Sequence, residues 1–260
     1  MIQEMIDSAK AGDTVKIPAG TYNIDLIHGP EKAGIILKSG ITLDLTDATL
    51  KANPTSELGY RILKVWDCDD VTIIGGNIIG DRDIHLGSTE WSVGGFGHGI
   101  CLRRANRIRI HRTHVSRCFA DGIYIDGDSS DVVVSNVVSD GNRRQGLSAI
   151  WVNNLLVTNC TFSNTGGTPP GDGIDLECDS PHQHIKNVLI DRCKFFNNEG
   201  SCVGVNGSPG TYQNIRITNC SFDMKSQPIW VAGGLNLGTP WWAMVLNRLL
   251  EFTPTYRWWG

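Results

Sequence analysis

The sequence contains few charged residues and no cluster of basic ones. Asp, Glu, Lys and Arg make up 19% of its 260 residues, and the formal net charge is −4. A nucleic-acid surface needs clustered Lys and Arg to neutralise phosphates, so we expect no nucleic-acid partner.

Long apolar runs are also missing. No run approaches the roughly 20 residues that a membrane-spanning helix requires, so no membrane partner is expected. The first residues, Met1 to Asp7, carry acidic side chains where a signal peptide carries basic ones. We therefore expect a soluble protein with no export signal in this sequence. The compartment stays open, because secretion or association with a virion through a longer full-length protein fits the same residues.

The eight cysteines lack the C-x2-C spacing of zinc sites. A chain of this length can bury a large core without disulfide bonds, so we expect free, packed thiols. Val137, Cys160, Cys193 and Cys220 would form one buried column. A second column, Asp131, Asn154, Asn187 and Asn214, has the residue types that favour left-handed turns, and we interpret it as a structural ladder.

Short strands recur along the chain at a nearly fixed period. Ile100, Ile123, Leu147, Ile174 and Val203 follow one another at spacings of 23, 24, 27 and 29 residues. A second set of strands advances in step at residues 108–110, 132–134, 155–157, 188–190 and 215–217. No repeat has room for a crossover helix, so the pattern predicts an all-β solenoid of stacked coils.

The two ends depart from this repeat. Residues 2–10 have apolar positions at helical spacing and Gly12 follows, so residues 1–12 are predicted to form a capping helix. Residues 13–232 would form about eight coils. In the tail, residues 233–260, a second helix that is rich in Trp is predicted to begin at Thr239 and Pro240. We interpret it as a cap on the last coil. The alternatives are a subunit contact, a membrane-surface role or a sugar-stacking role. We expect one domain, residues 1–260, and either a monomer or a homo-oligomer.

The N-terminal segment carries a family resemblance. An amphipathic helix followed by residues 11–22, AGDTVKIPAGTY, resembles the cap and first coil of the pectate lyase-like superfamily. The resemblance implies a right-handed parallel β-helix, and many members act on polysaccharides. It covers about residues 1–24 and indicates the fold better than the reaction.

Each coil of the predicted solenoid contributes one strand to the aligned set, called a rung here, and one of these rungs is acidic. In residues 171–177, GDGIDLE, apolar Ile174 and Leu176 alternate with Asp175 and Glu177, so one face packs inward and the other carries carboxylates. Aligning the rungs gives three outward columns. They are Cys101, Tyr124, Ser148, Asp175 and Gly204; Arg103, Asp126, Ile150, Glu177 and Asn206; and His98, Asp121, Gln145, Asp172 and Ser201.

Three chemistries fit these columns. Hydrolysis of a glycosidic bond needs two carboxylates, and Asp126 and Glu177 would lie two rungs, roughly 9.6 Å, apart, with Asp175 beside them. This leading hypothesis needs no cofactor and assigns the catalytic residues Asp126, Asp175, Glu177, Tyr124 and Arg103.

A uronate lyase or epimerase is the close alternative. It would hold Ca²⁺ on Asp126, Asp175 and Glu177, or neutralise the uronate with Arg103, and would take Tyr124, His98 or Arg103 as base. The third reading is a non-catalytic carbohydrate-binding or phage-fibre-like module. The substrate-binding candidates are His98, Asp121, Asp172, Trp91 and Arg144. The acidic residues and Arg144 also have a plain structural explanation as solvated or turn-forming residues.

Two short motifs resemble those of polygalacturonase-like proteins. Residues 97–99 look like their Gly-His-Gly and residues 121–123 like their Asp-Gly-Ile. Gly-His-Gly precedes the acidic rungs here instead of following them, so that family's catalytic roles are not carried over. The sequence thus predicts an enzyme that cleaves glycosidic bonds of a polysaccharide, expected to contain uronate.

Overall fold

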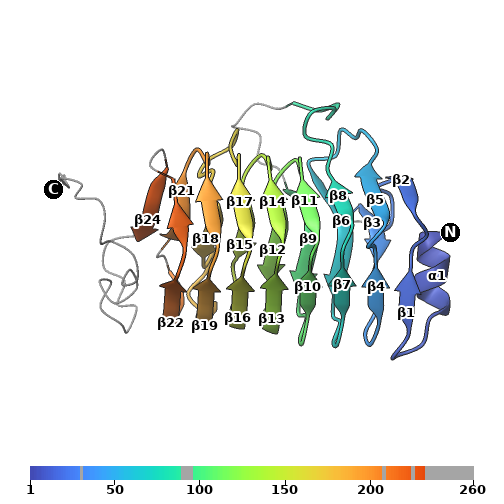
Figure 1. Ribbon diagram of the computed structural model, residues 1–260, viewed down its shortest axis with the longest axis horizontal. Helices are drawn as coiled ribbons and strands as arrows, with labels where there is room; N and C mark the ends of the chain where they lie inside the picture. Colours follow the sequence, from blue (N-terminus) through green and yellow to red (C-terminus); the bar gives the residue numbers. More distant parts are fainter. Residues whose placement is uncertain (30–31, 89–95, 207–208, 224–225, 232–260) are drawn as a thin grey trace.

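A computed structural model describes residues 1–29, 32–88, 96–206, 209–223 and 226–231. The chain winds into a parallel β-helix with three sheets of eight strands each (Figure 1). Every strand pairs in parallel with the equivalent strand of the neighbouring coil, such as β12 with β9 and β15. The predicted solenoid is therefore confirmed.

The three sheets are named here A, B and C. Sheet A contains β1 (Thr14–Lys16), β4 (Thr42–Asp44), β7 (Thr72–Ile74), β10 (Arg109–His111), β13 (Ser129–Ser135), β16 (Val152–Thr158), β19 (His184–Asp191) and β22 (Thr211–Thr218). Sheet B contains β2 (Gly20–Ile24), β5 (Ala48–Ala52), β8 (Asn77–Ile79), β11 (His114–Ser116), β14 (Val138–Asp140), β17 (Thr161–Ser163), β20 (Lys194–Phe196) and β23 (Ser221–Phe222). Sheet C contains β3 (Ala33–Ile36), β6 (Gly59–Trp66), β9 (Phe96–Arg103), β12 (Ile123–Asp126), β15 (Leu147–Ala149), β18 (Ile174–Glu177), β21 (Ser201–Asn206) and β24 (Gln227–Val231).

The core runs along the axis as columns of identical or similar side chains. Ile100, Ile123, Leu147, Ile174 and Val203 are paired in register across sheet C and are fully buried. In sheet B, Phe162, Phe195 and Phe222 stack with ring centroids 5.4 and 5.5 Å apart. The second predicted strand set lies in sheet A, where Val132, Leu155, Val188 and Ile215 pair in register, so the predicted register of both sets is correct.

The turn column is confirmed as a structural ladder. Asp131, Asn154, Asn187 and Asn214 all adopt left-handed backbone conformations, with φ between 53° and 60°. Asn154 donates to Asp131 and Asn214 donates to Asn187 through their side-chain amides. Asn tolerates this conformation better than most residues, which explains the composition of the column.

The cysteines are free, as expected, and seven of the eight are buried. The backbone N–H groups of Val137 and Cys193 face the sulfurs of Cys160 and Cys220. The predicted column is buried at Val137, Cys160 and Cys193 but only partly buried at Cys220. Helix α1 (Ile2–Ser8) lies at the N-terminal end of the stack and buries Ile2 and Ile6 (Figure 1). Its Gln3 side chain bonds the backbone of Ile36 in β3.

The predicted C-terminal helix, with its Trp-rich residues 233–260, lies outside the described residues. Trp91 also lies outside them. Within the described part of the chain, no helix has the length and apolarity needed to cross a membrane.

Candidate functional site

The outer face of sheet C brings the predicted columns together. Strand pairing aligns Cys101, Tyr124, Ser148, Asp175 and Gly204. Pairing also aligns Arg103 with Asp126, and Glu177 with Asn206. Between Asp126 and Glu177, β15 has already ended at Ala149, and the next residue, Ile150, is buried without joining the core cluster. The coil between those of Asp126 and Glu177 therefore carries an apolar residue at the corresponding position.

A column of glycines lets the strands of this face approach the core closely. A Cβ atom built on Gly146 would lie 2.8 Å from a ring carbon of Phe162, and one on Gly173 would lie 2.8 Å from a ring carbon of Phe195. Only glycine fits there. The residue before each glycine, such as Gln145 or Asp172, belongs to the predicted column of His98 and Asp121, and it is buried where an outward side chain was predicted.

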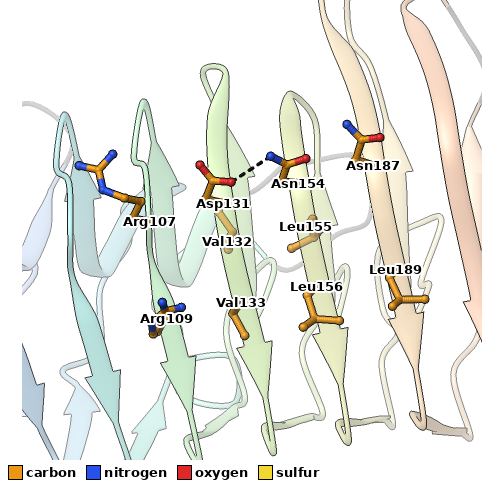
Figure 2. Close-up of a pocket in the computed structure, with 10 residues that line it drawn as sticks. All are labelled: Arg107, Arg109, Asp131, Val132, Val133, Asn154, Leu155, Leu156, Asn187 and Leu189. Carbon is orange, nitrogen blue, oxygen red and sulfur yellow. Dashed lines mark hydrogen bonds between the residues drawn. The ribbon is translucent and has the colours of Figure 1, made fainter.

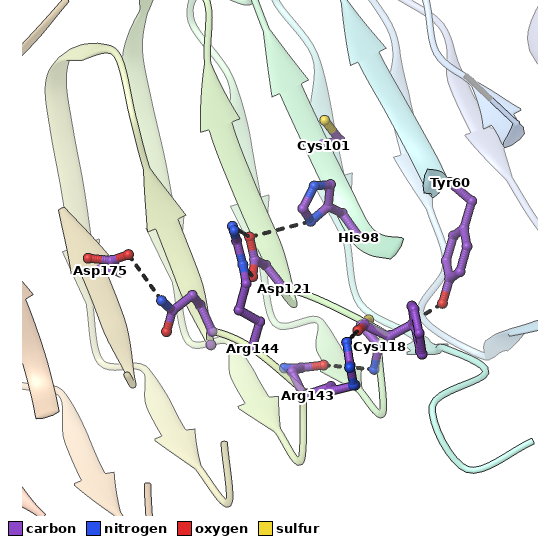
Figure 3. A network of polar contacts seen from close by, with 12 residues as sticks. Tyr60, His98, Cys101, Cys118, Asp121, Arg143, Arg144 and Asp175 are labelled. Atoms are coloured by element: carbon purple, nitrogen blue, oxygen red, sulfur yellow. Dashed lines mark hydrogen bonds and ion pairs between the residues drawn. The ribbon is translucent and has the colours of Figure 1, made fainter. Parts of the chain in front are cut away.

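Arg144 is the central cation of the site (Figure 3). Its Nε and Nη2 donate to the two carboxylate oxygens of Asp121 at 2.8 and 2.6 Å. Asp121 is fully buried, whereas the Arg144 side chain keeps 23% of its surface exposed. The pKa of Arg144 is raised, despite the burial that opposes its charge, by Asp121, then by Tyr124 and Asp175. This guanidinium therefore balances several anionic groups.

His98 lies beneath the surface and not on it. It is fully buried, its ring stacks on Tyr124 with centroids 4.4 Å apart, and Nδ1 lies 3.4 Å from Asp121 Oδ2 (Figure 3). Burial lowers the pKa of His98 to about 3, with Asp121 opposing the shift. The imidazole is thus neutral at neutral pH and supports Tyr124 from behind.

Asp175 is held by two amides. Gln145 Nε2 donates to its Oδ2 at 3.0 Å, and Asn206 Nδ2 donates to its Oδ1. We expected an outward, solvated carboxylate, but the side chain is only 2% exposed because neighbouring columns cover it. Burial raises the pKa of Asp175 well above its usual value, and the charges of Glu177 and Asp172 raise it further.

The pKa values of the neighbouring carboxyl groups are also raised. Burial and Asp179 raise the pKa of the half-buried Glu177, and burial raises the pKa of Asp172 to about 6. Partial desolvation and Asp126 raise the pKa of Asp179. Crowded carboxyl groups cannot all ionise together, so this group of acids retains protons at a higher pH than isolated carboxyl groups would.

A hollow also lies on this face of sheet C, and Asp126 is the carboxylate in its lining. It has a volume of ≈ 260 Å³ and is lined by Arg61, Trp66, Phe96, His98, Cys101, Arg103, Tyr124 and Asp126. Three cations lie over the Trp66 ring: Lys64 Nζ at 4.3 Å, the guanidinium of Arg103 at 5.2 Å and that of Arg61 at 5.3 Å from its centroid. An aromatic and basic surface therefore adjoins an acidic one on the same sheet.

A second hollow, of ≈ 360 Å³, lies on the outer face of sheet A (Figure 2). Its floor is apolar, with Val133, Leu156 and Leu189 from three successive strands. Asp131 is the single carboxylate among the described residues that line it, and Asn154 donates to it (Figure 2). This hollow lacks the paired acids that the face of sheet C provides.

One of the three candidate calcium ligands, Asp175, is already engaged. Both carboxylate oxygens of Asp175 accept hydrogen bonds from amides, an arrangement that orients them toward protein donors. Among the described residues, no three His, Cys, Asp or Glu side chains are arranged to hold a metal ion. Calcium binding by Asp126, Asp175 and Glu177 stays a prediction.

Two members of the site were missed in the sequence. Asp179 follows Glu177 by two residues and continues the acidic alternation. It was missed because the predicted strand, like β18, ends at Glu177. Trp66 pairs with Arg103, one coil before the aligned repeats began. Extending the alignment back by one coil would have found it. Arg143, the neighbour of Arg144, lies over the Phe119 ring at 4.5 Å and away from the acids.

Comparison with known proteins places the chain among β-helix sequences. The family described as Right handed beta helix region matches residues 26–185 and, in a second match, residues 95–237. Two curated relatives come from Bacillus subtilis (strain 168). The uncharacterized protein YclG is 28% identical over 221 residues, and the SPbeta prophage-derived uncharacterized protein YorA is 29% identical over 212 residues. The matches cover 75% and 71% of this chain but 38% and 36% of the relatives, so the chain spans little more than a third of their length.

Solved structures share the fold at low identity. The tailspike protein of E. coli bacteriophage HK620 matches with a TM-score of 0.67 at 14% identity, covering 90% of this chain and 44% of that one. Endo-xylogalacturonan hydrolase from Aspergillus tubingensis matches with a TM-score of 0.58 at 16% identity, covering 90% and 73%. At these identities the likeness establishes the common β-helix and leaves the chemistry to the site.

Proposed function

The chain belongs to the right-handed β-helix family, and on that premise we propose that it binds a polysaccharide along sheet C and hydrolyses its glycosidic bonds. The observation that carries this proposal is the gathering of four acids, Asp172, Asp175, Glu177 and Asp179, on β18 and directly beside its two ends, where burial raises the pKa of each. A protonated carboxyl group beside an ionised one is what acid-catalysed glycoside cleavage requires.

The proposed general acid is Glu177. It is half-buried, so a bound sugar can reach it. Burial and the charge of Asp179 raise its pKa and favour its protonated form, whereas Arg144 and the hydrogen bond with Asp175 act in the opposite direction. The buried Asp175, which hydrogen-bonds Glu177 and is itself held by Gln145 and Asn206, is assigned as a positioning residue that fixes the orientation of the Glu177 carboxyl group. Asp126 is the proposed base that activates water. Two strand spacings of ~4.8 Å separate their rungs, close to the upper end of the separation found in inverting enzymes.

A lyase or epimerase is the weaker candidate. Its base would have to lose a proton near neutral pH, but burial and Asp126 raise the pKa of Tyr124. His98 is neutral but fully buried behind Tyr124, so it does not meet a substrate directly. Arg103 stays the cation that would neutralise a uronate carboxylate in this reaction.

The test is incubation with a panel of acidic and neutral polysaccharides, with and without EDTA. Hydrolysis releases reducing ends without the ultraviolet absorbance of an unsaturated product. We expect reducing ends alone, unchanged by EDTA, and a loss of at least 100-fold in kcat for Glu177→Gln. Glu4→Gln, on the exposed surface of α1, is the matched control and should retain full activity. New absorbance would instead establish the lyase.

The rival from a different class is a carbohydrate-binding module. The phage tailspike in the comparison shares the β-helix, and Trp66 with Tyr124 offers rings against which sugars can pack. Binding to a glycan without release of reducing ends by the wild type would support this module and overturn the proposed hydrolysis.

A further inference from the structure

The outer face of sheet C changes its sign of charge along the helix axis. Over β6 and β9, Arg61, Lys64 and Arg103 surround the ring of Trp66. The hollow at this end is lined by two arginines and one carboxylate, Asp126. We call this part of the face the basic end.

The other part of the face lies over β18 and is termed the acidic end. Asp175 and Glu177 lie on β18, and Asp172 and Asp179 lie two residues before and after it. The charges of Glu177 and Asp172 raise the pKa of Asp175, and the charge of Asp179 raises the pKa of Glu177. The nearest cation, Arg144, already makes a bidentate ion pair with the buried Asp121. An anionic ligand at this end would therefore add negative charge where negative charge is already crowded.

The distance between the two ends follows from the strand order. Sheet C runs β18, β15, β12, β9, β6, so β9 and β18 are three strand spacings apart. At ~4.8 Å per spacing this is about 14 Å. The two ends are therefore far enough apart to contact different residues of a sugar chain that lies along the axis.

We infer, on the basis of the proposed function, that the substrate is a mixed polysaccharide with an anionic sugar bound against Trp66 and a neutral sugar over Glu177 at the cleaved bond. A polymer made only of uronic acids would place a carboxylate at the acidic end in every register, and repulsion would weaken its binding. A neutral polymer would leave the basic end without its anion. The anionic group can be a carboxylate or a sulfate ester, since both accept hydrogen bonds from Arg.

The experiment measures binding to the Glu177→Gln variant, so cleavage plays no part in it. The probes are unsulfated chondroitin and hyaluronan, in which uronate alternates with neutral sugar, together with polygalacturonate, dextran and carboxyl-reduced hyaluronan. We expect at least one alternating polymer to bind 10-fold or more tightly than polygalacturonate, dextran and the reduced polymer. Chondroitin sulfate against its unsulfated form distinguishes a sulfate from a carboxylate as the preferred anion.

Arg103→Met, added to Glu177→Gln, should remove this discrimination, whereas Lys194→Met on sheet B should leave it unchanged. Equal binding of polygalacturonate, discrimination that survives Arg103→Met, or no binding to any probe would overturn the inference. The two proposals fail separately. Discriminating binding without cleavage by the wild type contradicts the hydrolysis alone, and cleavage of polygalacturonate as fast as alternating polymers contradicts the mixed substrate alone.

Discussion

Asp172 occupies a space that two glycines leave open. Cβ atoms built on Gly200 and Gly204 would collide with its carboxylate, and the backbone N–H of Ser201 donates to it. Burial nevertheless raises the pKa of Asp172 from 3.8 to about 6. Between these pH values the folded protein keeps a proton that the unfolded chain has lost. The free energy of unfolding should therefore fall as the pH rises from about 4 to about 6.

Asp172→Asn should remove this part of the pH dependence. The amide oxygen can still accept from Ser201, but nothing titrates. Denaturant unfolding at pH 4, 5, 6 and 7 should show a variant whose stability falls less than that of the wild type, by at most about 3 kcal/mol over this range. Asp47→Asn, at an exposed position, is the control expected to keep the wild-type slope. Identical slopes for the wild type and Asp172→Asn would rule out a raised pKa at this site.

The ion pair of Arg144 and Asp121 gives a second prediction. Arg144→Met leaves the Asp121 carboxylate buried without its bidentate partner, and the loss of stability should be about 3–5 kcal/mol. Adding Asp121→Asn removes the orphaned charge, so the double variant should recover part of the loss. Urea denaturation of the single and double variants measures both effects. A double variant less stable than Arg144→Met would contradict this account.

The sequence reaches some of these residues and not others. Asp175 and Glu177 were predicted on one face because strand alternation fixes which side chains point outward, and the register confirms their columns. The burial of Asp175 was not predictable, because it depends on how Gln145 and Asn206 reach across neighbouring rungs. The ion pair of Arg144 with Asp121 was not predictable either, because it depends on how a long side chain bends and not on the spacing of the repeat.

At the scale of elements, the turn ladder carries its own prediction. Asn187 has φ of 55°, donates to Asn153 and accepts from Asn214. Asn187→Ala should cost about 1–2 kcal/mol, because alanine strains the left-handed backbone and loses both bonds. Asn187→Gly, which tolerates the backbone, should cost less. Thermal unfolding of the two variants separates backbone strain from hydrogen bonding, and equal losses would assign the whole effect to the hydrogen bonds.

The elements were more predictable than the site because each coil repeats the same packing problem. Five apolar residues at spacings of 23 to 29 were enough to fix the register of sheet C from Ile100 onward. The first coils were not aligned in the sequence, so Trp66, Arg61 and Lys64 were missed, and Arg103 was the one cation of the basic end that the sequence identified. The early end of β15 at Ala149 also breaks the period locally, which leaves Ile150 as a buried apolar residue that the pattern treated as an ordinary outward position.

At the scale of the whole molecule, the three sheets make the chain quasi-one-dimensional. A coil contacts mainly the coils before and after it, so the free energy of unfolding is approximately a sum of contributions from single coils and from the interfaces between neighbouring coils. Phe195 lies between Phe162 and Phe222 in sheet B and is 2% exposed. Phe195→Ala should cost about 3–5 kcal/mol, and the cost should be confined to the adjoining coils.

Hydrogen exchange followed by mass spectrometry can locate that loss. In Phe195→Ala we expect amides of β17, β20 and β23 to lose protection, while amides of β2, β5 and β8 keep the wild-type rates. Leu50→Ala in β5, where Leu50 is fully buried, is the mirror control and should give the opposite pattern. Equal loss at both ends in either variant would mean that the coils unfold as one cooperative unit. A local loss in both would mean that the acidic and basic ends of sheet C can be altered by mutation without unfolding each other.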